Sequence, residues 1–140
     1  MTDLQLAKTN LDGHTICLCK NGQCIFSEKR GIAPMMDFIA EGLDLNGYSV
    51  ADLVVGKAAA MLFVKSGIQN VFARTLSLSG KEILEMHGVH CEYEILTDKI
   101  INRQGTDICP MEKTVLSTQD VEEGYLLLQR QLAVMRGQNS

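Results

Sequence analysis

The Asn21-Gly22 dipeptide limits the choice of fold for this 140-residue chain more than any other short segment. It separates two short runs of mainly apolar residues, at positions 14–19 and 23–27. A two-residue Asn-Gly loop favours a type I′ turn, because both central residues of that turn need positive φ. The sequence therefore predicts a β-hairpin near the N-terminus.

Helix and strand patterns alternate after this hairpin. Strands are predicted at residues 50–55, 71–75 and 89–96, and helices at residues 3–9, 34–41, 57–65, 79–87 and about 118–136, with a brief helix after Cys109. Ser79 and Glu82 are expected to form a capping box, and residues 99–102 to pair at the sheet. A hairpin followed by alternating helices and strands predicts an α/β fold, a three-layer α/β/α sandwich with a mixed sheet. We see no repeat or linker and expect a single domain over residues 1–140.

Composition excludes several classes of protein. A net charge of −4 without a basic run argues against a duplex nucleic-acid partner. The longest apolar run, residues 58–64, is too short to cross a membrane. The first residues lack the pattern of a signal peptide, so we expect a cytoplasmic protein whose five cysteines are reduced.

Three of these cysteines share one face of the predicted hairpin. Its register places Cys19 directly across from Cys24, with Cys17 on the same side. Three such thiols could bind a soft metal or form a Cys19–Cys24 disulfide. Small core residues are their commoner role, and the sequence leaves these alternatives open.

The segment Cys109-Pro110-Met111-Glu112-Lys113 resembles a catalytic motif with one key residue replaced. Zinc-dependent nucleoside deaminases carry P-C-x-x-C at a helix start, and glutamate stands here in place of the second cysteine. Residues 54–60 (VVGKAAA) and Asn102-Arg103 with Gly105-Thr106 extend the likeness. Over residues 13–116 the chain resembles a family of small, uncharacterised bacterial and archaeal proteins with the cytidine-deaminase-like fold. The resemblance implies that fold, but it carries no established reaction.

Conventional zinc deamination does not fit the residues present. Such a site needs a histidine and two cysteines on the metal, and a glutamate that moves protons. The matching helix start here is Gly56-Lys57-Ala58, which has neither histidine nor glutamate. A literal H-x-E occurs at His90-Cys91-Glu92, but alternation places its two polar residues on the wet face of a strand. We therefore expect no metal and no other cofactor.

Cys109, Lys57 and Glu112 remain as candidate catalytic residues. At the N-cap of a helix Cys109 is either a thiolate nucleophile or simply the cap. Glu112 either bonds back to the cap of its own helix or acts as a general acid and base. Lys57 either binds an anion or carries a proton, unless its stem only covers apolar neighbours.

Further candidates lie around these three residues. Gly56, Asn102, Arg103 and Asp107 are the expected substrate-binding residues, and Arg103 suits a phosphate or carboxylate. Asp52 is expected at an exposed strand edge, the other possibility being a buried pair with Lys57.

Three functions compete on this pattern. The first is a metal-independent enzyme that acts on a small anionic or nucleotide-like substrate through Cys109 and Lys57. The second is a non-catalytic binding or regulatory module with the same pocket. The third is a structural protein, and a homodimer is a reasonable assembly for any of them.

Overall fold

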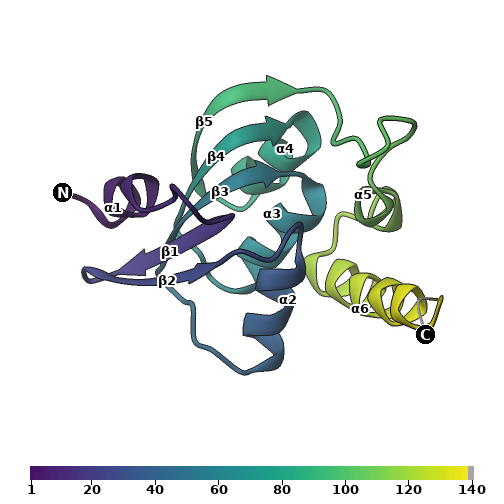
Figure 1. Ribbon diagram of the computed structural model, residues 1–140, viewed down its shortest axis with the longest axis horizontal. Coiled ribbons are helices and arrows are strands. Elements are labelled where there is room, and N and C mark those ends of the chain that lie inside the picture. Colours follow the sequence, from purple (N-terminus) through teal and green to yellow (C-terminus); the bar gives the residue numbers. More distant parts are fainter. Residues whose placement is uncertain (139–140) are drawn as a thin grey trace.

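A five-stranded mixed sheet forms the centre of the computed structural model, which describes residues 1–138 (Figure 1). The strand order is β2-β1-β3-β4-β5. The strands are β1 (Ile16–Lys20), β2 (Gln23–Ser27), β3 (Ser49–Val55), β4 (Asn70–Ser77) and β5 (His90–Thr97). β1 is antiparallel to both β2 and β3, whereas β3, β4 and β5 are mutually parallel. The predicted α/β class and mixed sheet are confirmed.

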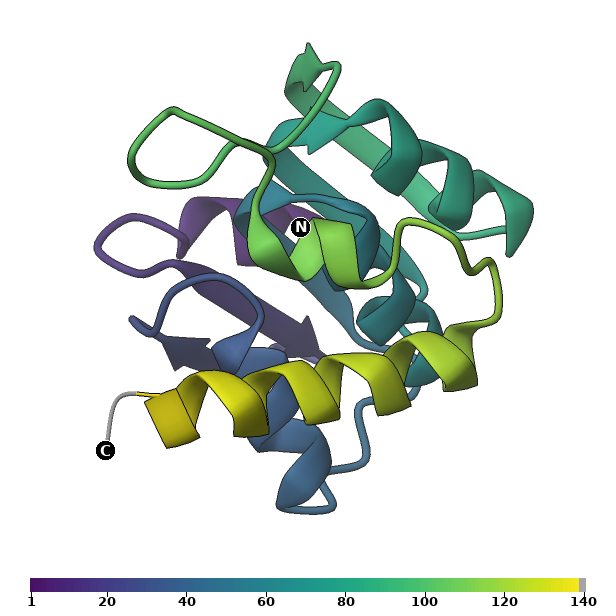
Figure 2. The same ribbon diagram turned by 90° about the vertical axis from the view of Figure 1, so that its right-hand side faces the viewer.

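Helices cover both faces of this sheet. They are α1 (Asp3–Thr9), α2 (Ala33–Ala40), α3 (Lys57–Lys65), α4 (Leu78–Met86), α5 (Pro110–Thr114) and α6 (Val121–Gln138). Figure 1 shows α1 alone on one face and α2, α3 and α4 on the other, which gives the three layers. α5 and α6 pack outside α3, and Figure 2 shows α6 running across the front of that layer.

The hairpin forms as its turn chemistry predicts. Asn21 and Gly22 have φ values of 52° and 81°, and the register pairs Lys20 with Gln23. The Asp3 carboxylate accepts hydrogen bonds from the backbone N–H groups of Asn21 and Gly22, at 3.0 and 3.2 Å. The start of α1 is thereby tied to the turn of the hairpin.

α3 is the central helix of the larger core. Its residues from Lys57 to Phe63 are all buried, in keeping with a helix that is apolar nearly all round. α6 approaches it closely at Gly124, where a Cβ atom would stand 2.6 Å from Met61 Sδ. Leu128 of α6 is fully buried in the same core, so this face of the helix packs against α3.

Two local predictions are wrong. β4 continues to Ser77, so the N-cap of α4 lies two residues earlier than expected: the side chain of Ser77, not Ser79, accepts the capping bond from Gly80 N–H. Residues 99–102 do not join the sheet, because Ile101 forms an isolated bridge with Ile108 within its own loop.

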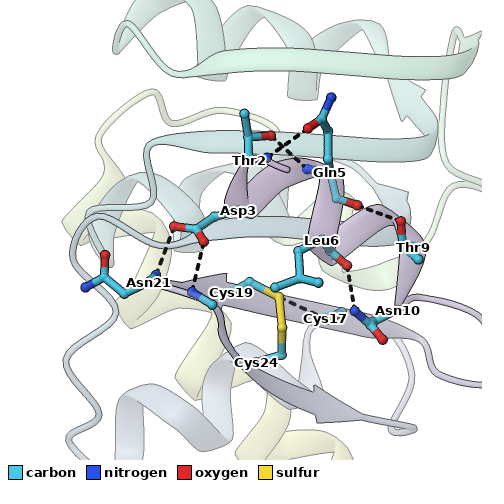
Figure 3. The surroundings of a disulfide bond; sticks show 11 residues. Thr2, Asp3, Gln5, Leu6, Thr9, Asn10, Cys17, Cys19, Asn21 and Cys24 are labelled. Carbon is cyan, nitrogen blue, oxygen red and sulfur yellow. Dashed lines mark hydrogen bonds between the residues drawn. A yellow bond between two sulfur atoms is a disulfide. The ribbon is translucent and has the colours of Figure 1, made fainter.

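The expectation that all five cysteines are reduced is also wrong. Cys19 and Cys24 form a disulfide, as direct cross-strand partners whose Cα atoms are 4.2 Å apart (Figure 3). Cys17, Cys91 and Cys109 are free. Across residues 1–138, no helix combines the length and the apolar character needed to cross a membrane.

Candidate ligand-binding site

A cavity of about 510 Å³ opens at the carboxyl end of β3, beside the start of α3. Because β1 runs antiparallel to β3, the start of β1 and the segment after β2 reach the same end of the sheet. The segment that leads into α5 closes the other side. The residues that line it include Thr15, Arg30, Asp52, Gly56, Arg103, Cys109 and Glu112.

Asp52 brings a buried carboxyl group to this cavity. It lies within β3, opposite Ile16 of β1, and only 7% of its surface is exposed. Burial raises the pKa of this carboxyl from 3.8 to about 8, although backbone hydrogen bonds from Val54 and Leu53 act in the opposite direction. The expected exposed position is therefore wrong, because Asp52 lies in the middle of β3, between partners in β1 and β4.

No cation neutralises Asp52 within residues 1–138, since none of the ion pairs in that part of the chain includes it. The alternative pairing with Lys57 is thus not formed. With a pKa near 8, the Asp52 carboxyl group is protonated in most of the molecules at pH 7, so it can donate as well as accept a hydrogen bond.

Glu112 joins two helices. Its carboxylate accepts hydrogen bonds from the backbone N–H groups of Lys57 (2.7 Å) and Ala58 (2.8 Å), at the start of α3. Gly56, the N-cap of α3, has no side chain to satisfy these groups, and a Cβ atom there would overlap Glu112 Oε1. Glu112 therefore caps the neighbouring helix instead of its own, which neither predicted role anticipated.

Lys57 lies close in the chain but points elsewhere. It is 6% exposed, and its Nζ donates to the carbonyl of Leu116 at 3.3 Å. It does not line the cavity. The predicted grouping of Lys57 with Cys109 and Glu112 in one pocket is therefore only partly formed.

Cys109 occupies the predicted N-cap of α5 and lines the cavity. It is half-buried, and its thiol makes no capping hydrogen bond. Pro110 is the first residue of the helix, as expected from its fixed φ. The thiol is thus available to a molecule in the cavity.

The loop before Cys109 divides its polar residues between two roles. Arg103 lines the cavity, whereas Asn102 holds the loop through bonds with Thr106. Asp107 pairs with Lys113, and the hydrogen bond from Lys113 holds the pKa of Asp107 below its usual value. Asn102 and Asp107 therefore shape the loop and do not line the cavity.

Two polar residues of this site were missed at the sequence level. Thr15 precedes β1 and Arg30 follows β2, so the hairpin brings them to its open end, away from the Asn-Gly turn. The predicted hairpin register already implied this closeness. The position of the hairpin against β3 did not follow from the sequence, so neither Thr15 nor Arg30 was recognised as a candidate site residue.

The literal H-x-E motif lies away from the cavity. His90 Nε2 and Glu92 Oε2 are 2.9 Å apart on β5, where His90 is exposed. Glu92 also pairs with Lys8 of α1, and the hydrogen bond from His90 is the largest cause of its lowered pKa. The two side chains form a surface network.

Comparison with known proteins places the chain in a family. A crystal structure of a DUF1893 family protein from Thermotoga maritima is similar over 94% of this chain and 91% of its own, with 21% identity and a TM-score of 0.83. A dCMP deaminase from the cyanophage S-TIM5 gives 14% identity and a TM-score of 0.44, over 56% of this chain and 77% of its own. The third structure is a diaminohydroxyphosphoribosylaminopyrimidine deaminase/5-amino-6-(5-phosphoribosylamino)uracil reductase from Thermotoga maritima. It gives 18% identity and a TM-score of 0.45, over 66% of this chain and 34% of its own.

Comparison with curated proteins gives no match. The family model described as "Domain of unknown function (DUF1893)" matches residues 5–132, which is most of the chain. The family predicted from the sequence motifs is therefore confirmed, and this chain belongs to the DUF1893 family.

Proposed function

We propose that this protein binds a small anionic, nucleotide-like molecule in the cavity at the end of β3, as a binding or regulatory module. Arg30 and Arg103 would bind the anionic group, and Asp52 would bind a hydrogen-bonding group on the body of the ligand. The observation that carries the proposal is the meeting of two arginines and a buried aspartate in one cavity of about 510 Å³. That volume is typical of small-molecule sites.

The two arginines support the anionic part of this proposal. They come from separate segments, and within residues 1–138 neither takes part in an ion pair. A guanidinium group binds carboxylate or phosphate through two parallel hydrogen bonds. On a chain with a net charge of −4, two such groups at one cavity favour an anion locally.

Binding is favoured over catalysis because two of the three candidate catalytic groups have structural partners. The Glu112 carboxylate caps α3, and the Lys57 ammonium bonds the Leu116 carbonyl. A general acid or base must reach the proton that it transfers. Neither group is free to do so in this arrangement.

A second candidate is a metal-independent enzyme that uses Cys109 as a nucleophile. The half-buried position of this thiol at the cavity wall favours it. In that case Cys109→Ser should abolish turnover of a bound ligand and leave its affinity nearly unchanged. If no bound ligand is turned over by the wild-type protein, the enzyme hypothesis fails and the binding function stands.

Calorimetric titration with nucleoside monophosphates and the matching nucleosides tests the binding proposal. We expect at least one monophosphate to bind more tightly than its nucleoside, because only the former offers an anion to the arginines. Arg103→Gln should weaken that binding at least tenfold. Arg74→Gln, which changes an exposed arginine of β4 outside the cavity, is the matched control and should bind like the wild type.

Two results would overturn the proposal. One is equal binding of every monophosphate and its nucleoside, or no binding of either. The other is an affinity that Arg103→Gln leaves unchanged. Protection of Cys109, but not Cys91, from iodoacetamide by the bound ligand gives an independent check of where the ligand sits.

A further inference from the structure

The hairpin brings three sulfur atoms together under α1, on the opposite face of the sheet from α2, α3 and α4 (Figures 1 and 3). The sulfur atoms of Cys17, Cys19 and Cys24 all lie within 4.8 Å of one another. Cys19 and Cys24 are joined by the disulfide, and the free sulfur of Cys17 is 3.6 Å from that of Cys19. The cluster is thus one reduction step away from three neighbouring thiols.

The surroundings of this trio are apolar. Leu4, Ala7 and Leu11 cover it together with Ala51 and Phe72, and Leu6 and Leu53 pack at its edge. Cys17 and Cys19 are fully buried, whereas Cys24 is half-buried and gives access from outside. Soft sulfur ligands in such surroundings select soft metal ions over hard ones.

We propose that the reduced hairpin is a binding site for one Cu(I) ion, held by Cys17, Cys19 and Cys24, and that the disulfide is its closed form. Two electrons and two protons from a dithiol reductant, which itself becomes a disulfide, convert the Cys19–Cys24 bond into two thiols. Cu(I) then displaces protons from sulfur as it binds. No change in the oxidation state of copper is required.

The geometry fits three-coordinate binding. With metal–sulfur distances of about 2.3 Å, three sulfurs in a trigonal arrangement stand roughly 4 Å apart. The sulfur atoms of Cys17 and Cys19 are already 3.6 Å apart and all three lie within 4.8 Å of one another, so only the bonded pair, Cys19 and Cys24, must separate when the disulfide opens. Zn²⁺ fits less well because it takes four ligands. Within residues 1–138 the cluster contains no fourth histidine, cysteine, aspartate or glutamate.

The site is independent of the cavity at the end of β3. None of the three cysteines lines that cavity. Failure of either proposal therefore leaves the other intact.

Competition with a Cu(I) chelator tests the proposal. The full chain is reduced with a phosphine, transferred to anaerobic buffer and titrated with Cu(I) in the presence of bicinchoninate. We expect one equivalent of copper to move from the chelator to the protein, with ultraviolet absorption from sulfur-to-copper charge transfer. The air-oxidised protein should take up none at this site.

Serine variants locate the ion. Cys17→Ser, Cys19→Ser and Cys24→Ser should each weaken copper binding at least tenfold, whereas Cys91→Ser and Cys109→Ser should bind like the wild type. Circular dichroism of each variant shows that it is folded. The proposal is overturned if the reduced wild type takes no copper from the chelator, or if Cys24→Ser and Cys17→Ser retain full affinity.

Discussion

Asp52 is the residue whose environment departs most from what its type prefers. A carboxyl group inside a strand, without a cation beside it, is stable mainly in its neutral form. Its pKa near 8 in the folded state lies far above the value of 3.8 expected on unfolding. Between about pH 4 and pH 8 the unfolded chain therefore binds fewer protons at this position than the folded chain, and stability must fall as pH rises through that window.

Asp52→Asn should remove this dependence, because an amide has the shape of the neutral carboxyl group and does not titrate. As pH rises from 5 to 8, the free energy of unfolding of the variant should increase relative to that of the wild type by at least about 1 kcal/mol. Urea denaturation across this range measures the difference. For the control Asp98→Asn, at an exposed position after β5, the free energy of unfolding should depend on pH as it does in the wild type. Parallel curves for Asp52→Asn as well would mean that Asp52 is ionised in the fold.

At the scale of elements, α3 depends on a residue that lies 54 positions away from Ala58 in the sequence. Helix starts leave unsatisfied N–H groups, which a nearby Ser, Thr, Asp or Asn usually satisfies. α3 begins after a glycine and uses Glu112 of α5 instead. The carboxylate connects these two helices at the edge of the cavity.

Glu112→Ala should lower the free energy of unfolding by about 2–4 kcal/mol, because it leaves two buried N–H groups without an acceptor. Gly56→Ala should also destabilise, since the new methyl group displaces the carboxylate. The two changes attack one interaction, so the double variant should cost less than the sum of the single ones. Urea denaturation of all four proteins gives the cycle, with Glu94→Ala as an exposed control. Strict additivity would show that Glu112 does not cap α3.

The elements themselves were largely predictable, because local chemistry determines them. The Asn-Gly turn and the apolar sequence of α3 each act within a few residues. The start of α4 was misplaced because Ser77 and Ser79 are both suitable caps, and only the length of β4 decides between them. The partner of Glu112 could not be read from the sequence. The glycine before α3 shows that the first N–H groups of this helix need an acceptor from elsewhere, but it does not show which residue supplies that acceptor.

At the scale of the whole molecule, the site depends on how distant segments meet. Arg30, Asp52 and Arg103 come from a loop, a strand and a second loop that only the packed sheet brings together. The sequence indicated Arg103 and Cys109 because motifs mark them. Lys57 was grouped with them because Gly56-Lys57-Ala58 matches the helix start that carries zinc-site residues in zinc deaminases. The sequence could not show that the lysine side chain turns toward Leu116, which depends on how the chain continues after α5.

The Cys19–Cys24 disulfide acts on the whole molecule through the unfolded chain. It closes a short loop, with a sequence separation of 5, so chain entropy gives it about 2 kcal/mol. Reduction should therefore lower the melting temperature by on the order of 5–10 °C. Differential scanning calorimetry with and without a phosphine measures this change. The double variant Cys19→Ser/Cys24→Ser should not respond to the phosphine.

Copper should reverse the effect of reduction, because an ion that binds only the folded chain stabilises it. At a free concentration 100 times the dissociation constant the gain is about 2.7 kcal/mol, which exceeds the estimated loss of the disulfide. The reduced protein with Cu(I) should then melt near or above the oxidised protein. If Cu(I) leaves the reduced melting temperature unchanged, the three thiols do not hold it and the hairpin cysteines act through the disulfide alone.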